Sequence, residues 1–89
     1  MREFCERNHI QKLWLYGSVL EERFRPDSDV DILIDYDPAH VPSLFKLGGM
    51  TADLEDALGR EVDLKTPGFM PQAVLERVLR TAELLYDAQ

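Results

Sequence analysis

The feature that most constrains the fold is an alternating segment, residues 29–36, with the sequence DVDILIDY. Successive side chains of a β-strand point to opposite faces, so this segment has one apolar face and one mostly acidic face. The apolar face carries Val30, Ile32, Ile34 and Tyr36, and the other carries Asp29, Asp31, Leu33 and Asp35. The pattern predicts a strand whose apolar face packs against helices and whose acidic face is open to solvent or a ligand.

Three elements are expected before this strand. We predict a short polar helix over residues 2–8 and a buried strand over residues 12–16 that Gly17 ends. Ser18 can cap a helix through about residue 24, because its side chain accepts hydrogen bonds from first-turn N–H groups. Residues 25–28, RPDS, have the composition of a turn.

A longer helix is expected after the strand, over residues 43–58, with Ser43 as its N-cap and Gly59 at its end. Gly48 and Gly49 inside it indicate either a close neighbour or a bend, because glycine is unfavourable in a helix interior. The apolar stripe of this helix carries Leu44, Leu47, Met50, Leu54 and Leu58.

The C-terminal part predicts one more strand and one more helix. Residues 60–65 read as a short strand on which Asp63 faces away from the core. Pro71 fits the first turn of a last helix, whose apolar stripe carries Val74, Leu75, Val78 and Leu79. Residues 83–86 fit either an extension of that helix or an edge strand. The whole order predicts one small α+β (α/β) domain over residues 1–89, with helices flanking a small mixed sheet.

Composition limits the functions that such a domain can have. Among its 89 residues, 17 are Asp or Glu and 10 are Lys or Arg, and the resulting net charge of −7 disfavours stable binding to nucleic acid. The single cysteine, Cys5, excludes an internal disulfide and a cysteine metal cluster. Because no apolar run approaches the ~20 residues that cross a bilayer and no signal-peptide segment opens the chain, we expect a cytoplasmic protein without membrane contact.

Asp29 and Asp31 are the first candidate ligands. Two aspartates that are two residues apart on a strand project the same way, so their carboxylates can converge on a shared pair of cations. Their mutual repulsion calls for positive charge between them or for protonation of one of them. Hard oxygen ligands without nearby His or Cys favour Mg²⁺, or Mn²⁺, over zinc.

Gly17 and Ser18 add a candidate phosphate site. A glycine that ends a strand and a serine that opens a helix direct backbone N–H groups and a hydroxyl at a point where anions bind. If this bend and the two aspartates share one edge of the sheet, together they form a nucleoside triphosphate site. Asp63 on the next strand could complete the shell of one metal and accept a proton from an attacking hydroxyl.

These residues also form a recognisable signature. Gly17-Ser18, ten residues and then Asp29-Val30-Asp31, in the setting LYGSVLEERFRPDSDVDILIDYD, resemble the minimal nucleotidyltransferases of the polymerase-beta superfamily. The resemblance is to the MNT antitoxins encoded beside HEPN toxins in particular, and LGREVDLKTP matches the place of the third aspartate in that family. It runs from about residue 10 to residue 86 and implies a polymerase-beta-like nucleotidyltransferase fold.

The resemblance implies a role for each motif residue. Gly17 and Ser18 would hold the β- and γ-phosphates of ATP. Asp29 and Asp31 would bind two Mg²⁺ ions, and Asp63 would ligate the catalytic metal and help to deprotonate the acceptor. The reaction would be in-line attack of a hydroxyl on the α-phosphate, with pyrophosphate leaving. In the antitoxin branch the acceptor is a tyrosine of the partner HEPN ribonuclease, which AMP transfer silences.

Other functions fit parts of the sequence. The same chemistry could act on a small molecule or an RNA end, and a non-catalytic antitoxin could neutralise its partner by binding alone. With any of these functions the protein could form a homo- or hetero-oligomer. The aspartates also imitate the start of an EF-hand loop. That interpretation fails because Ile32 stands where the loop needs glycine and Pro38 where it needs glutamate.

Overall fold

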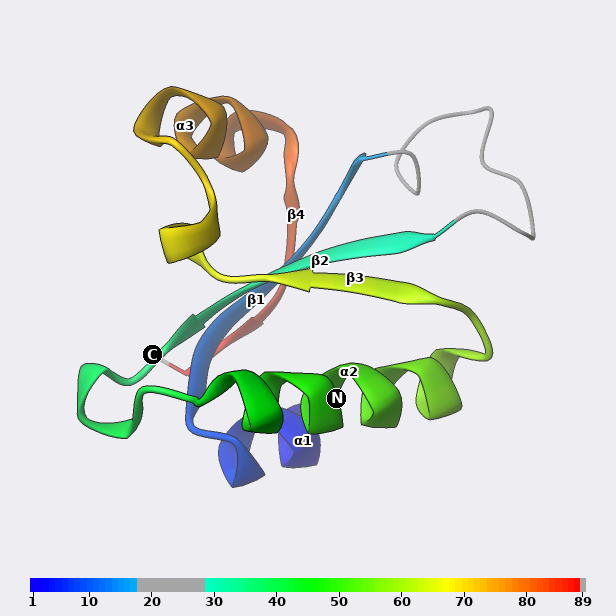
Figure 1. Ribbon diagram of the computed structural model, residues 1–89. Helices are drawn as coiled ribbons and strands as arrows, with labels where there is room; N and C mark the ends of the chain where they lie inside the picture. The colour runs from blue at the N-terminus through cyan, green and yellow to red at the C-terminus, as the bar shows by residue number, and fades with distance from the viewer. Residues whose placement is uncertain (18–28, 89) are drawn as a thin grey trace.

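Four strands form one mixed sheet in the order β3-β2-β1-β4 in the computed structural model, which describes residues 1–17 and 29–88 (Figure 1). Strand β1 pairs antiparallel with both β2 and β4, and β2 pairs parallel with β3. The strands are β1 (Ile10–Tyr16), β2 (Val30–Tyr36), β3 (Val62–Lys65) and β4 (Glu83–Asp87). The helices are α1 (Arg2–Arg7), α2 (Leu44–Leu58) and α3 (Gln72–Thr81), with short 3-10 turns η2 (Pro38–His40) and η3 (Pro67–Phe69). The sheet with flanking helices confirms the predicted α+β class.

The core lies between the sheet and one layer of helices. Helices α1 and α2 lie on one side of the sheet and α3 on the other (Figure 1). The predicted alternation of β2 is confirmed, because Val30, Ile32 and Ile34 are all buried in the layer under α1 and α2. The buried cluster comprises Cys5, Ile10, Leu13, Val30, Ile32, Ile34, Met50, Leu54 and Val62. Leu33, on the opposite face of β2, is also fully buried.

Helix α2 begins and ends where its caps predict. The Ser43 Oγ accepts a hydrogen bond from the Lys46 N–H at 3.1 Å, and Gly59 takes a left-handed conformation with φ 69° at the C-terminus. The helix runs unbroken through Gly48 and Gly49, and a Cβ at either glycine would meet no atom within 4 Å. Of the two alternatives, a close neighbour or a bend, the close neighbour is therefore wrong.

The expected apolar stripe of α2 is only partly buried. Met50 and Leu54 are 2 % exposed, whereas Leu44 is 78 % and Leu58 40 % exposed, so the two ends of the stripe lie outside the core. A 15-residue helix is about 22 Å long, and only its middle turns lie over the small sheet. Phe45, in the first turn, is 93 % exposed.

This uneven burial gives a first prediction. Leu54→Ala should lower the free energy of unfolding by about 2–5 kcal/mol, since it removes buried methyl groups and leaves a cavity. Phe45→Ala on the same helix should change it by less than about 0.5 kcal/mol, because the ring is already in water. Urea unfolding of both variants measures the difference, and equal costs would contradict the described packing of α2.

The remaining differences from expectation lie mostly towards the ends of the chain. Strand β1 begins at Ile10, two residues earlier than expected, and the open assignment of residues 83–86 is settled as edge strand β4. Helix α3 begins at Gln72 with Pro71 directly before it. The helix and turn predicted over residues 18–28 lie outside the described residues. In the described part of the chain, helices are too short or too polar to cross a membrane.

Candidate active site

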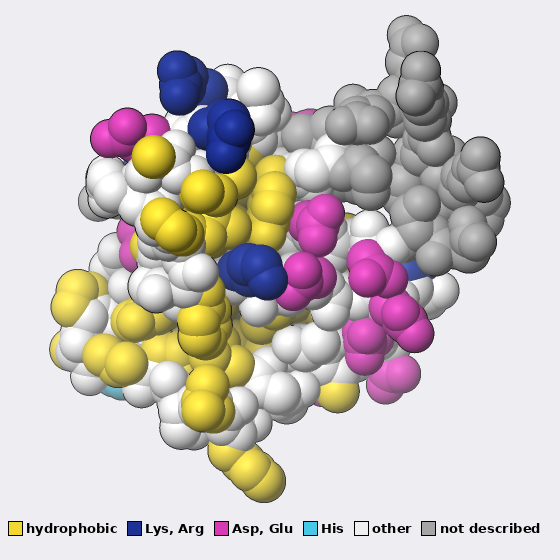
Figure 2. All heavy atoms as spheres, turned by 45° about the horizontal axis from the view of Figure 1, so that its top comes forward, with side chains coloured by type: hydrophobic (Ala, Val, Ile, Leu, Met, Phe, Trp, Pro, Cys, Tyr) yellow, Lys and Arg dark blue, Asp and Glu magenta, His cyan; other side chains and the backbone are white. Residues whose placement is uncertain are grey.

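A row of three polar side chains crosses three adjacent strands. Tyr16 of β1 is the register partner of Asp31 of β2, and Asp31 is in turn the register partner of Asp63 of β3. Register partners on neighbouring strands point to the same face of a sheet. Their strand neighbours Leu15, Ile32 and Val62 lie in the core or pack against it under α2, so all three side chains leave the sheet on the α3 side. Viewed with that side turned forward, acidic side chains gather on the surface with a basic one beside them (Figure 2).

Gly17 and Asp29 lie at the ends of two of the three strands that carry this row. Gly17 directly follows β1 with φ 77°, and a Cβ there would collide with the Asp31 Oδ2 and lie 3.2 Å from the Asp31 Cγ. The absence of a side chain at Gly17 therefore leaves room for the carboxylate of Asp31. Asp29 is exposed and precedes β2, two residues before Asp31. Ser18, the other half of the expected phosphate site, lies outside the described residues.

An ion pair joins Lys65 to the third aspartate. The Lys65 Nζ donates a hydrogen bond to the Asp63 Oδ1 at 3.1 Å, with side chains 37 % and 45 % exposed. The two residues are two apart on β3, so they share a face. This places one positive charge at the end of the carboxylate row.

Negative charge still dominates the site. Burial raises the pKa of Asp31, the charges of Asp63 and Asp29 raise it further, and only Lys65 works in the opposite direction among the causes. Burial, and then the charges of Asp31 and Asp63, raise the pKa of Tyr16 to about 12. Tyr16 is therefore a neutral phenol at physiological pH, able to donate a hydrogen bond.

The chemistry of these oxygens fits a hard divalent cation. In residues 1–17 and 29–88, no three His, Cys, Asp or Glu side chains stand close enough to enclose a metal by themselves. Mg²⁺ does not need such a cage, because it binds through one or two carboxylates together with waters and substrate phosphates. The raised pKa of Asp31 reflects like charges that such a cation would offset. Asp29, Asp31 and Asp63 are the residues that would hold it.

Two residues of this site were not identified from the sequence. Lys65 follows Asp63 by two positions on a predicted strand, and this spacing alone puts both on one face. Tyr16 ends the expected buried strand over residues 12–16, where its ring was expected to pack in or beside the core or to stack on a base. The same alternation that identified the aspartates could have found Lys65.

Residues 1–85 match the family model described as the nucleotidyltransferase domain. The chain belongs to this family. The expected resemblance is thereby confirmed, and so is the expectation of an enzyme. The protein adenylyltransferase MntA of Thermococcus cleftensis is 34 % identical to this nucleotidyltransferase over 85 residues, which are 96 % of this chain and 82 % of the relative.

Solved structures show the same fold. A crystal structure of a toxin-antitoxin with AMP-PNP superposes with a TM-score of 0.80 at 21 % identity, covering 99 % of this nucleotidyltransferase and 71 % of that chain. A structure of the tri-AMPylated Shewanella oneidensis HEPN toxin in complex with its MNT antitoxin gives 0.71 at 20 % identity, covering 97 % and 66 %. The predicted nucleotidyltransferase fold is confirmed over nearly all of the chain.

Proposed function

We propose that this nucleotidyltransferase is a Mg²⁺-dependent protein adenylyltransferase that moves AMP from ATP to a tyrosine hydroxyl of a HEPN toxin and so acts as its antitoxin. The observation that carries the proposal is the Asp31–Asp63 pair on one sheet face, with the backbone of Gly17 against Asp31. The adenylyltransferase activity named for the 34 % identical relative supports the reaction. The AMP-PNP and HEPN complexes of structurally similar chains support the nucleotide and the partner.

Each residue of the site has a part in this reaction. Gly17 and Ser18 would bind the β- and γ-phosphates, and Asp29, Asp31 and Asp63 would hold two Mg²⁺ or Mn²⁺ ions. When bound, these ions offset phosphate charge and lower the pKa of the acceptor hydroxyl. The acceptor oxygen forms a bond to the α-phosphorus, and the bond from that phosphorus to the pyrophosphate oxygen breaks. Asp63 takes the proton of the hydroxyl.

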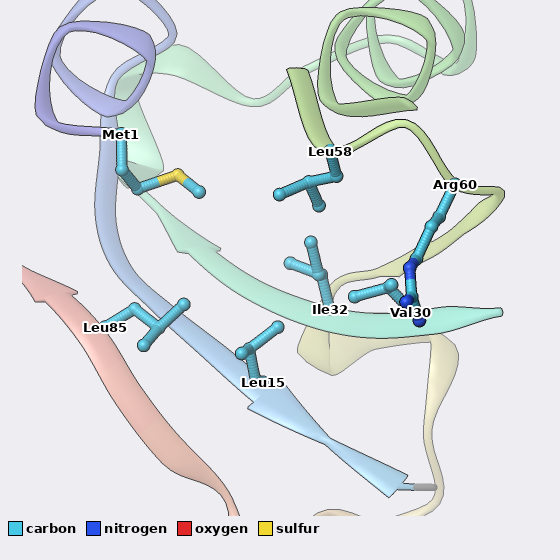
Figure 3. Close-up of a pocket in the computed structure, with 7 residues that line it drawn as sticks. All are labelled: Met1, Leu15, Val30, Ile32, Leu58, Arg60 and Leu85. Carbon is cyan, nitrogen blue, oxygen red and sulfur yellow. The ribbon is translucent and has the colours of Figure 1, made fainter. Parts of the chain in front are cut away.

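The shape of the described surface favours a protein acceptor over a small molecule. A cavity of about 220 Å³ lies beside the core face of the sheet (Figure 3). Leu15 and Ile32 in its lining are next to Tyr16 and Asp31 along their strands, so the cavity is on the opposite face from the carboxylate row. Its lining is almost wholly apolar and comprises Met1, Leu15, Val30, Ile32, Leu58, Arg60 and Leu85. The carboxylate row itself is partly exposed, which suits a side chain presented by another protein. Residues 1–89 would then act as one catalytic domain in the cytoplasm, where ATP and Mg²⁺ are present.

The proposal is tested by incubating the protein with ATP labelled at the α-phosphate, Mg²⁺ and the HEPN protein encoded by the adjacent gene. We expect label on a tyrosine of the partner, lost in the Asp29→Ala/Asp31→Ala double variant. Asp35→Ala, on the same face of β2 but farther along the strand, is the matched control and should keep the activity. The partner's ribonuclease activity is measured in parallel.

Two outcomes would overturn the proposal. If the double variant silences the ribonuclease as well as the wild type does, the protein neutralises by binding and not by catalysis. If the label goes to RNA or to a small molecule and the partner stays unlabelled, the nucleotidyltransferase chemistry holds but the acceptor is different.

A further inference from the structure

Lys65 is placed to control the orientation of Asp63. It lies two residues after Asp63 on β3, and its register partner on β2 is Leu33, which is fully buried. Its alkyl stem therefore leaves the sheet beside a packed apolar residue, while the ammonium group reaches back along the strand. There the Nζ contacts the Asp63 Oδ1 at 3.1 Å. The result is a part-buried ion pair within one short strand.

The pair opposes a repulsion that the fold creates. The parallel register of β2 and β3 puts Asp63 directly beside Asp31, and two ionised carboxylates at such positions push each other apart. A carboxylate on a solvent-facing side of a sheet can relieve this repulsion by rotating outward about its side-chain bonds. The contact with Lys65 restrains that rotation, because the donor comes from the same strand.

An ammonium group also leaves Asp63 available for chemistry. Lysine is a compact point charge, whereas arginine often engages both oxygens of a carboxylate at once. The Lys65 Nζ contacts Oδ1, so Oδ2 keeps its lone pairs for another partner. In the reaction proposed above, that partner is the acceptor proton or a metal ion.

We propose that Lys65 is a positioning residue for AMP transfer, which holds Asp63 through Oδ1 so that the carboxylate stays in the row beside Asp31 with its second oxygen directed to the reaction. The inference rests on the proposed function, since it assigns Asp63 a part in that transfer. It gives Lys65 no contact with substrate.

The kinetic test removes the charge and keeps the stem. Lys65→Met should lower kcat for AMP transfer about 10–100-fold, the usual effect of losing a group that orients a catalytic ligand, and change KM for ATP less than about 3-fold. Lys65→Arg should restore only part of kcat, because a guanidinium often engages both oxygens of a carboxylate and would then occupy Oδ2 as well. Lys46→Met on α2 is the matched control and should leave both constants unchanged. A loss confined to KM for ATP, or no loss at all, would overturn the positioning role.

A double-mutant cycle separates positioning from general stability. In an Asp63→Asn background, Lys65→Met should cause little further loss, because the carboxylate that it holds has gone. Full additivity of the two losses would overturn the proposal. Lys65→Gln serves as the charge-free variant if circular dichroism shows that Lys65→Met is not folded.

A readout without catalysis distinguishes this proposal from the proposed function. The chain has three lysines, Lys12, Lys46 and Lys65, so the NMR signals of their ammonium groups can be assigned by substitution. Asp63→Asn should shift the Lys65 signal and leave the Lys46 signal in place, in metal-free buffer. If the wild type transfers no AMP, the proposed function fails while this shift still shows the ion pair. If the Lys65 signal does not move, the positioning role fails whatever the activity.

Discussion

Asp31→Asn is expected to abolish AMP transfer and at the same time to stabilise the fold. Asp31 is a proposed ligand of the metal ions, which supply several kcal/mol of transition-state stabilisation. Its loss should therefore lower the transfer rate at least about 1000-fold. The same change removes a half-buried charge that Asp63 and Asp29 repel. Because water screens these partly exposed carboxylates, we expect the gain in unfolding free energy to be no more than about 1 kcal/mol, a rise in Tm of up to about 5 °C.

The effect of Mg²⁺ on Tm tests the loss of the metal ligand and the gain in stability in one experiment. Added Mg²⁺ should raise the Tm of the wild type, because a ligand that binds only the folded state stabilises it, and should have little effect on Asp31→Asn. Asp35→Asn, four residues along the same strand face, is the control and should keep both the transfer and the Mg²⁺ response. An Asp31→Asn protein that still transfers AMP at more than about a tenth of the wild-type rate would refute the assignment of Asp31.

The stability gain should depend on pH in a defined direction. The pKa of Asp31 is raised in the folded protein, so the fold favours the protonated carboxyl. The stabilising contribution of the Asp31 carboxyl to the folded state is therefore present below its unfolded-state pKa and is lost as the pH rises through its folded-state pKa. The difference in unfolding free energy between Asp31→Asn and the wild type should be largest at pH 7 and should decrease as the pH falls towards the ordinary carboxyl pKa of 3.8. Urea unfolding in EDTA at both pH values measures it, and a gap that widens in acid would contradict burial and like-charge repulsion as the cause.

Gly17→Ala should have the second largest effect. The positive φ of Gly17 costs an alanine about 1–2 kcal/mol, and the added methyl group would collide with the Asp31 carboxylate. The carboxylate must then move out of the row that it shares with Asp63. A displacement of about 1 Å is enough to slow a positioned reaction about 100-fold, so we expect a loss of that size in kcat.

Gly59→Ala separates backbone strain from the collision. Gly59 also has a positive φ, 69°, but a Cβ there would meet no atom within 4 Å. Gly59→Ala should therefore cost about 1 kcal/mol of stability and leave AMP transfer unchanged. Should Gly59→Ala and Gly17→Ala reduce transfer equally, the contact between Gly17 and Asp31 would have no special part in the site.

Local sequence pattern was sufficient to predict much of the fold and part of the candidate site. The alternation in β2 put Ile32 in the core and Asp31 on the opposite face, and the caps of α2 located its ends at Ser43 and Gly59. These features depend on neighbours within a few residues, where side-chain periodicity and hydrogen bonding to the backbone decide the conformation. The placement of Asp63 away from the core follows from the same rule.

The remaining features depend on contacts between distant segments. Residues 83–87 form a strand because β1 offers them an edge, with Leu84 opposite Trp14, and no periodicity within ELLYD distinguishes that from a helix. The exposure of Leu44 depends on how far α2 extends past the sheet. Asp31 and Asp63 are likewise neighbours because of the register between β2 and β3, which the sequence alone does not determine.

The parallel pairing of β2 with β3 also decides when, during synthesis, the protein can first work. Asp31 leaves the ribosome long before Asp63, and the two meet only after the whole of α2 has been made and has crossed back over the sheet. A nascent chain that stalls within α2 carries the complete Asp-x-Asp motif without its partner carboxylate. On the proposed function, a truncated translation product without Asp63 is therefore expected to transfer no AMP.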